Sequence, residues 1–304
     1  IKVPSKELAL SPADGVFPVG VHLVATDWRG ERNPQSRARD LTLLPRLGAD
    51  APPVATGLVW PFIQTWDVTH PDPQQIALSV SSGQLRHYLD AAISAPVGAR
   101  SLLIDPALLD SIESIASEAK ELKIDAAVAE DMTKWNAELV DLSQKSDTWL
   151  IDYTRPDYFG FAGTKHAKDF NSTIRTATSD AAARHKLSGK RVIWPAEPDA
   201  TQTFVEQLRT LKPDAVIVSS KQLIGWEPSD GSRITSGQGP AAQDLVAVTG
   251  LASAQTKQSS SLFVQHTLSK ATLASLEIDA DQAAQSDALT FVDPRWDPQT
   301  SPLD

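Results

Sequence analysis

The sequence predicts an α/β protein whose main part is a (β/α) barrel, TIM-like or incomplete, with an N-terminal β-hairpin or β-sandwich remnant. Three observations lead to this prediction. Apolar runs of four or five residues recur along the chain, segments with apolar residues at helical spacing separate them, and an alternating apolar pattern occurs near the N-terminus. Continuous apolar runs between helices are typical of strands covered on both faces, as in a parallel sheet. Alternation is typical of a strand with one buried face.

The N-terminal residues 1–52 are predicted to form a separate unit, with the barrel in residues 53–304. Apolar residues alternate with others over residues 19–25, turn residues follow, and a second apolar run returns through residues 41–44. This pattern predicts a β-hairpin. Because a lone hairpin is only marginally stable in water, we expect it to dock on the barrel or to close a β-sandwich.

The barrel strands are predicted from eight apolar runs. In chain order these runs begin at Gly57, Ser101, Thr148, Arg191, Ala215, Leu245, Ser261 and Leu289. An open doubly wound sheet is the second interpretation. The barrel is favoured because no Gly-rich phosphate-binding turn follows the early runs.

The helices are predicted from apolar spacing and from their end signals. Asp105 followed by proline is the preferred cap and first-turn pair, which predicts a helix over residues 106–120. Apolar residues at helical spacing predict a second helix around residues 135–142. A third, around residues 178–187, is expected to end at Gly189, because glycine commonly follows a helix C-terminus.

The composition limits the partners and the chemistry. A net charge of −10 and a pI near 5.1 argue against a nucleic acid or an anionic membrane surface as partner, since both reward clustered Lys and Arg. The absence of cysteine excludes disulfides, thiolate catalysis and cysteine-based metal sites. No two of the six histidines are four residues apart, so neither a helical zinc pair nor the His-x-x-x-His of polysaccharide deacetylases is present. No metal and no cofactor are predicted.

Functional residues in such barrels lie at the C-terminal ends of the strands, and two chemical groups stand out there. The carboxylates are Asp105, Asp152, Glu197 and Asp293; the aromatic residues are Trp60, Tyr153, Trp194 and Trp296; His266 and Arg295 complete the set. Carboxylates beside flat aromatic rings are typical of a sugar site, where acidic oxygens bind hydroxyls or act as acid and nucleophile. Asp152, Glu197 and Asp293 are the predicted catalytic residues, and the others are predicted to bind the sugar.

Each candidate also has a structural interpretation. Asp105 is explained by helix capping, and tryptophans that precede prolines are explained by packing at the barrel rim. Arg295 and Asp293 fit a terminal ion pair. Glu197 fits a solvated loop charge, and His266 fits a hydrogen-bonded structural histidine. These interpretations stay open beside the functional ones.

Six short phrases resemble a known family. In order they are GVFPVGVH at 15–22, LVWP at 58–61, IDPALLD at 104–110, RPD at 155–157, VIWPA at 192–196 and VDPRW at 292–296. Together they resemble an actinobacterial envelope family, the domain-of-unknown-function family numbered 6049, over nearly the whole chain. The resemblance implies an exported protein with a signal peptide, an immunoglobulin-like segment, a barrel similar to carbohydrate-active folds and a C-terminal membrane anchor, often encoded beside the lipid II flippase.

No catalytic residues are established for that family, so the resemblance assigns none here. His266 also lies in a strand-end segment where an aspartate would be expected. This departure weakens any claim of a shared acid at that position.

The leading interpretation is an extracytoplasmic barrel that binds or senses a cell-wall glycan or an envelope-assembly protein without hydrolysing it. Contact with a membrane would come only through an anchor absent from this chain. The enzymatic alternative is a glycoside hydrolase that uses two of the strand-end carboxylates. It requires a pair about 5 to 5.5 Å or 6.5 to 9.5 Å apart in an open cleft, and buried or capped carboxylates would argue against it. The third alternative is a structural scaffold.

Overall fold

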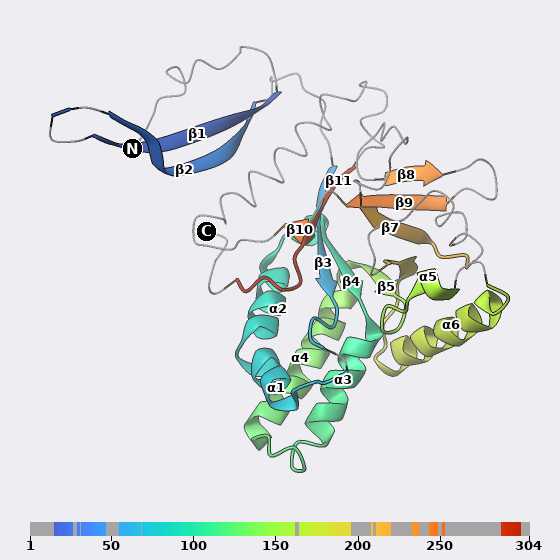
Figure 1. Ribbon diagram of the computed structural model, residues 1–304. Helices are drawn as coiled ribbons and strands as arrows, with labels where there is room; N and C mark the ends of the chain where they lie inside the picture. The colour runs from blue at the N-terminus through green and yellow to red at the C-terminus, as the bar shows by residue number, and fades with distance from the viewer. Residues whose placement is uncertain are drawn as a thin grey trace.

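A computed structural model of the protein describes the greater part of the chain (Figure 1). The described residues are 15–26, 29–30, 32–46, 55–67, 69–161, 164–195, 208, 211–219, 233–236, 243–248, 251–252 and 287–298. They form a nine-stranded sheet with helices, and a separate two-stranded sheet.

The large sheet is parallel apart from one edge strand, as the continuous apolar runs predicted. Its strands are β3 (Ala55–Phe62), β4 (Arg100–Ile104), β5 (Asp147–Ile151), β6 (Lys190–Ile193), β7 (Ala215–Ser219), β8 (Arg233–Ser236), β9 (Gln243–Val248), β10 (Leu251–Ala252) and β11 (Asp287–Val292). Their spatial order is β10-β11-β3-β4-β5-β6-β7-β9-β8, and only β8 runs antiparallel to its neighbour. The sheet is curled into a half-barrel, which confirms the predicted fold class. Seven of the eight predicted runs are strands, and the run that begins at Ser261 lies outside the described residues.

One segment of chain links the two ends of the curled sheet. β9 pairs with β7, and β10 pairs with β11, although only residues 249–250 separate β9 from β10. Since consecutive Cα atoms are about 3.8 Å apart, the Cα atoms of Val248 and Leu251 are at most about 11 Å apart. This short link limits the distance between β7, the partner of β9, and β11, the partner of β10, across the opening of the half-barrel.

The sheet has an inner and an outer apolar face. The inner cluster contains Val59, Ile63, Leu103, Trp149, Ile151, Val192, Ile217, Leu289 and Phe291. The outer cluster joins Trp60, Phe62, Leu102 and Ile104 to residues of the helices. Because side chains alternate along a strand, positions 105, 194 and 293 continue the inner row, and positions 60 and 152 belong to the outer row.

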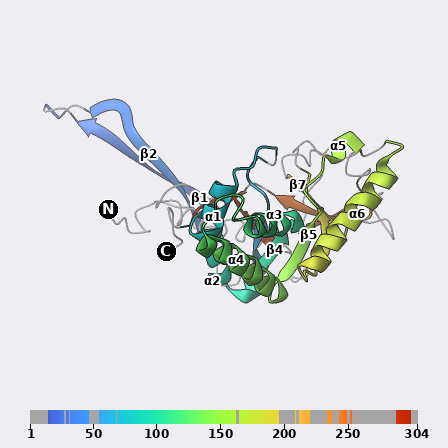
Figure 2. The same cartoon turned by 90° about the horizontal axis from the view of Figure 1, so that it is seen from below.

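Helices cover the outer face of the sheet (Figure 2). They are α1 (Pro73–Ser81), α2 (Gln84–Ser94), α3 (Pro106–Ser117), α4 (Ala126–Gln144), α5 (Tyr158–Phe161) and α6 (Ala167–Arg184), with a short 3₁₀ turn η2 (Val97–Ala99). The helices predicted over 106–120 and 135–142 are confirmed as α3 and α4. In the described parts of the chain, every helix is too short or too polar to cross a bilayer.

The end of α6 differs from the prediction. The helix stops at Arg184, before Gly189, and Lys186 adopts a left-handed conformation with φ of 55° while the amide of Leu187 bonds back to the carbonyl of Ala182. Gly189 has a different role. A Cβ there would lie 2.4 Å from the carbonyl oxygen of Thr148, so glycine allows the chain to pass close to β5 just before β6.

The predicted hairpin is present. β1 (Gly15–Thr26) pairs antiparallel with β2 (Arg32–Arg46), with Val19 opposite Thr42, and the two strands form a sheet of their own. The boundary between units 1–52 and 53–304 stays a prediction.

The close approach at Gly189 makes the first testable prediction. Gly189→Ala should lower the free energy of unfolding by roughly 1–3 kcal/mol, because the backbone of β5 or β6 must shift to admit a methyl group. Gly98→Ala is the matched control, since nothing lies within 4 Å of its added Cβ. Urea unfolding of both variants measures the difference, and equal stabilities would contradict the close approach.

Candidate functional site

Asp105 lies at the C-terminal end of β4 and is 1% exposed. Its Oδ1 accepts hydrogen bonds from the amides of Ala107, 2.9 Å away, and Thr154, 3.2 Å away. The first bond caps α3, as the Asp-Pro pair predicted, and the second holds the loop after β5. Burial raises the pKa of Asp105 to about 6, although these two hydrogen bonds and the charge of Arg155 oppose the rise.

The loop after β5 is strained. Thr154 and Arg155 are consecutive non-glycine residues in the left-handed region, with φ of 62° and 49°. Each costs about 1 kcal/mol or more relative to ordinary conformations, and such residues cluster at functional sites. The amide of Thr154 bonds to Asp105, and the amide of Arg155 bonds to the carbonyl of Asp152 at 2.9 Å. These two bonds hold the strained loop at the strand ends.

Arg155 and Trp194 meet at this end of the half-barrel. The Arg155 guanidinium carbon lies 5.3 Å from the centre of the Trp194 ring, which is the distance of a cation–π contact. Trp194 is half-buried, follows β6 on the inner row and packs edge-on against Phe291 of β11 at 5.9 Å. We call Asp105, Arg155 and Trp194 the barrel mouth. Arg155 was not among the predicted site residues, although it opens the RPD phrase directly after a predicted strand end.

Asp152 has a structural environment that does not fit the predicted catalytic role. It is on the outer row and completely buried, and Arg191 binds it in a bidentate manner at 2.6 and 2.5 Å. The Tyr158 hydroxyl donates to Oδ2 of the same carboxylate. Arg191 also donates to Asn171 of α6 at 3.1 Å. The carboxylate therefore ties β5, β6 and α6 together.

The residues after β11 form a turn. Oδ1 of Asp293 accepts a hydrogen bond from the amide of Arg295 at 2.8 Å, and the carbonyl of Asp293 accepts one from the amide of Trp296 at 3.0 Å. Asp293 is half-buried, and Arg295 is exposed. This turn explains Asp293 without a catalytic role.

Trp60 and Trp296 do not lie at the barrel mouth. Trp60 is completely buried on the outer row of β3, and Trp296 is 3% exposed with its ring centre 6.3 Å from that of Trp60. Both line a cavity of about 620 Å³ against residues of α2. Their rings face the outer layer, which does not fit the predicted role as sugar platforms at the strand ends. Glu197 and His266 lie outside the described residues, so their predicted roles stay predictions.

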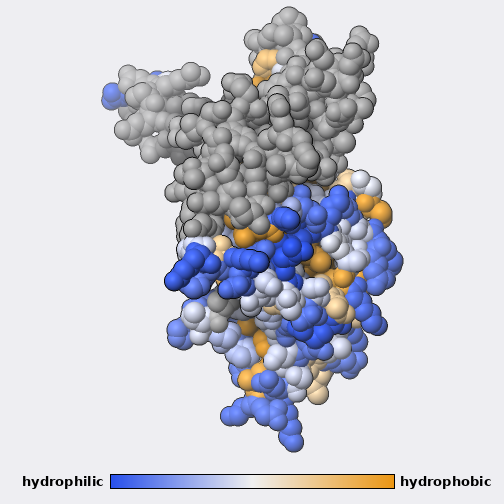
Figure 3. Space-filling model, turned by 90° about the vertical axis from the view of Figure 1, so that its right-hand side faces the viewer, coloured by the Kyte–Doolittle hydropathy of each residue, from blue (hydrophilic) through white to orange (hydrophobic). Residues whose placement is uncertain are grey.

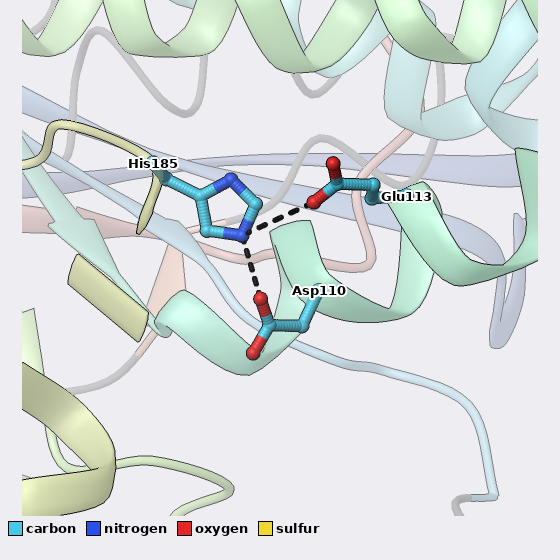
Figure 4. Close-up of side chains that lie close together, drawn as sticks. All are labelled: Asp110, Glu113 and His185. Atoms are coloured by element: carbon cyan, nitrogen blue, oxygen red, sulfur yellow. Dashed lines mark hydrogen bonds and ion pairs between the residues drawn. The ribbon is translucent and has the colours of Figure 1, made fainter. Parts of the chain in front are cut away.

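A second group of polar side chains joins α3 to the end of α6 (Figure 4). His185 Nε2 lies 2.7 Å from Oδ1 of Asp110 and 3.9 Å from Oε2 of Glu113, a spacing that is compatible with three ligands of one metal ion. The other oxygen of Asp110 accepts hydrogen bonds from the Tyr153 hydroxyl at 2.9 Å and from Arg184 at 2.5 Å.

These contacts favour an ion-pair network over a metal site. Burial acts to raise the pKa of Asp110, but the hydrogen bonds from Arg184, His185 and Tyr153 outweigh it and lower the pKa. Protein donors thus already stabilise the ionised carboxylate, and the positive charge of Arg184 would repel a cation there. Tyr153, predicted as a sugar-binding residue, is bound to this network.

The comparisons with known proteins agree with the fold. No protein-family model and no curated protein matches the sequence, so the resemblance to family 6049 stays a prediction. A 4-α-glucanotransferase structure from Thermococcus litoralis is similar at a TM-score of 0.52 and 11% identity, over 83% of this chain and 35% of that one. This likeness shows the fold, and the chain spans about a third of the glucanotransferase.

Two further structures are more distant. An α-amylase from Thermotoga maritima has a TM-score of 0.40 and 12% identity, over 69% of this chain and 48% of its own. A protein assigned as a polysaccharide deacetylase from Mycobacterium smegmatis has a TM-score of 0.44 and 8% identity, over 83% of this chain and 80% of its own.

The buried pair of Asp152 and Arg191 makes a prediction about stability. Asp152→Asn should lower the free energy of unfolding by about 3–5 kcal/mol, because it leaves a buried arginine without its counter-charge. Asp141→Asn is the control: Asp141 pairs with Lys145 on the exposed face of α4, where such a pair contributes less than about 1 kcal/mol. Similar losses for the two variants, measured by chemical unfolding, would contradict the structural role.

The raised pKa of Asp105 makes a prediction about pH. An aspartate in an unfolded chain has a pKa of about 3.9, whereas the folded value is about 6, so the folded state binds the proton more tightly. The resulting stabilisation is present below about pH 4 and is lost as the pH rises through about 6. From pH 7 to pH 5 the wild-type protein should gain about 1 kcal/mol relative to Asp105→Asn. Unfolding both proteins at the two pH values measures this gain, and no change in their difference would refute it.

Proposed function

We propose that the protein binds a cell-envelope glycan at the barrel mouth and holds it without hydrolysing it. One observation carries the proposal. The described strand-end carboxylates are engaged in structural bonds, whereas Trp194 and Arg155 form a half-buried aromatic and cationic surface at the same end of the half-barrel.

A glycan fits this surface by its chemistry. Sugar rings place C–H groups against indole faces and place hydroxyls against charged and polar groups, and the mouth offers both kinds of partner. The mouth lies at the strand ends where barrels of this class bind ligands. The resemblance to an exported family is the basis for proposing the cell envelope, and the 4-α-glucanotransferase of similar fold is a carbohydrate-active protein by name.

Binding without hydrolysis follows from the positions of the carboxylates. A glycosidase needs two carboxyl groups facing one bond, one as acid and one as nucleophile or base. Asp152 is on the outer row and paired with Arg191, and Asp293 holds the turn after β11. Among the described candidates this leaves Asp105, which caps α3.

The face shown in Figure 3 gives no support to a scaffold that docks a partner through an apolar surface. On the face shown in Figure 3, the described residues are mostly hydrophilic and the apolar ones are scattered. Scattered apolar residues are normal on a protein surface and do not mark a docking site.

A glycoside hydrolase is the second candidate, and the pKa of Asp105 favours it. A carboxyl group with a pKa of about 6 lies in the range where a general acid works near neutral pH. The partner carboxylate would be Glu197. Release of new reducing ends from an envelope polysaccharide, lost in Asp105→Asn, would replace the non-hydrolytic proposal.

Binding to purified peptidoglycan and arabinogalactan fragments tests the proposal. Trp194→Ala should weaken binding by about tenfold or more, which corresponds to about 1.4 kcal/mol of lost stacking, and Trp194→Phe should retain part of the affinity. Ile93→Ala, on the exposed face of α2, is the control and should bind as the wild type does. Calorimetric titration gives the affinities, and unchanged binding by a folded Trp194→Ala would exclude the mouth as the glycan site.

A further inference from the structure

We infer that Arg155, supported by Arg295, binds a carboxylate of the glycan, so that the ligand is an acidic sugar. This inference rests on the function proposed above and goes beyond it by naming the substrate class. The geometry around Arg155, the charges that act on it and its contact with Trp194 support it independently.

The first observation is an unsatisfied donor. The Nε of Arg155 is buried, and it finds no hydrogen-bond partner among the residues that the structure describes. Buried polar groups are nearly always paired, and leaving one unpaired costs about 1–3 kcal/mol. Arg155 also lies in the strained loop, where left-handed Thr154 and Arg155 are held by hydrogen bonds. Strained residues cluster at ligand sites, and we therefore take the unpaired donor in this loop as a pointer to a ligand.

The second observation is the stacked guanidinium. The Trp194 ring lies 5.3 Å from the guanidinium carbon. A guanidinium that stacks on an aromatic ring is restricted in its orientation, and its planar N–H groups match the two oxygens of a carboxylate. An acidic sugar whose ring lies near Trp194 would therefore bring its carboxylate within reach of Arg155.

The third observation is the local charge. Burial lowers the pKa of Arg155, the negative charge of Asp105 opposes this, and the positive charge of Arg295 lowers it further. Among the residues that the structure describes, the charges that act on Arg155 are one negative and one positive, which together with the arginine leaves a net positive charge. The chain as a whole carries −10, so this excess of positive charge is a local feature of the mouth.

The size of the uncompensated charge favours a carboxylate. A single positive charge is balanced by one carboxylate, whereas a phosphate monoester carries about −1.5 to −2 at neutral pH. A muramic acid lactyl group or a uronic acid supplies one carboxylate on a sugar ring. Phosphate-bearing sugars are therefore an outcome to be tested.

The test compares an acidic disaccharide with its neutral methyl ester and with a sugar that carries a phosphate. The probes are the disaccharide of N-acetylglucosamine and N-acetylmuramic acid with a free lactyl carboxylate, its methyl ester, and N-acetylglucosamine 6-phosphate. Calorimetric titration of the wild type at low salt should give at least about tenfold tighter binding of the acid than of the ester, as expected for a charge-assisted hydrogen bond of about 1.5–3 kcal/mol. Added salt should weaken binding of the acid and leave binding of the ester nearly unchanged.

The variants assign the effect to Arg155. Arg155→Met keeps much of the side-chain packing and removes the charge, so its affinities for the acid and for the ester should become equal. Arg295→Gln changes an exposed side chain and should reduce the preference for the acid in part, without affecting folding. Arg175→Met, on the exposed face of α6, is the charge-matched control and should keep the full preference.

The outcomes separate the two proposals. Equal binding of acid and ester by the wild type, or a preference that survives in both Arg155→Met and Arg295→Gln, overturns the carboxylate inference and leaves the proposed glycan site standing. Tighter binding of the phosphate than of the carboxylate also overturns it. Binding of no probe at all overturns this inference, and it overturns the proposed function as well only if the peptidoglycan and arabinogalactan fragments also fail to bind.

Discussion

The barrel mouth depends on one oxygen atom of Asp105. This oxygen accepts the amide that begins α3 and the amide of Thr154 in the loop after β5, so it fixes a helix and a neighbouring loop relative to one strand end. The left-handed conformations of Thr154 and Arg155 are unfavourable by themselves, and they persist because the surrounding bonds determine them. The position of Arg155 against Trp194 follows from this arrangement.

A carboxylate with such a role is constrained in its chemistry. Both hydrogen bonds to Asp105 favour the ionised form, yet burial dominates and raises its pKa to about 6. A residue that must accept two backbone amides cannot readily swing toward a substrate. Its burial therefore serves the shape of the mouth, whose half-buried side chains are Arg155 and Trp194.

The architecture was predictable because it depends on local patterns. Apolar runs separated by helical spacing gave the parallel strands, and the Asp-Pro pair at 105–106 gave the start of α3. The direction of the strand-end side chains was not predictable. In a strand covered on both faces the inner and outer residues are equally apolar, so the run that contains Trp60 carries no sign that this ring faces the helices. The same ambiguity placed Asp152 among the catalytic candidates.

Arg155 was missed for a different reason. Left-handed conformations are usually signalled by glycine, and neither Thr154 nor Arg155 carries that signal. Gly189 shows the reverse case. It was interpreted as a helix end, but it is required by the nearness of the Thr148 carbonyl, a contact between strands that no local pattern records. In both cases the decisive partner lies far away along the sequence or in a neighbouring strand.

The pairing of β3 with β11 has a consequence for how the protein is made. Ala55 of β3 lies opposite Asp287 of β11. One edge of β3 therefore stays unpaired until β11, more than two hundred residues later in the chain, has been synthesised. Until then β3 has an open hydrogen-bonding edge, which is a template for wrong pairing with another chain. Contacts this distant along the sequence also slow folding, because the intervening chain must be ordered first. A nascent chain of this protein is thus most exposed to aggregation before β11 emerges, and this interval is when a chaperone would protect it most.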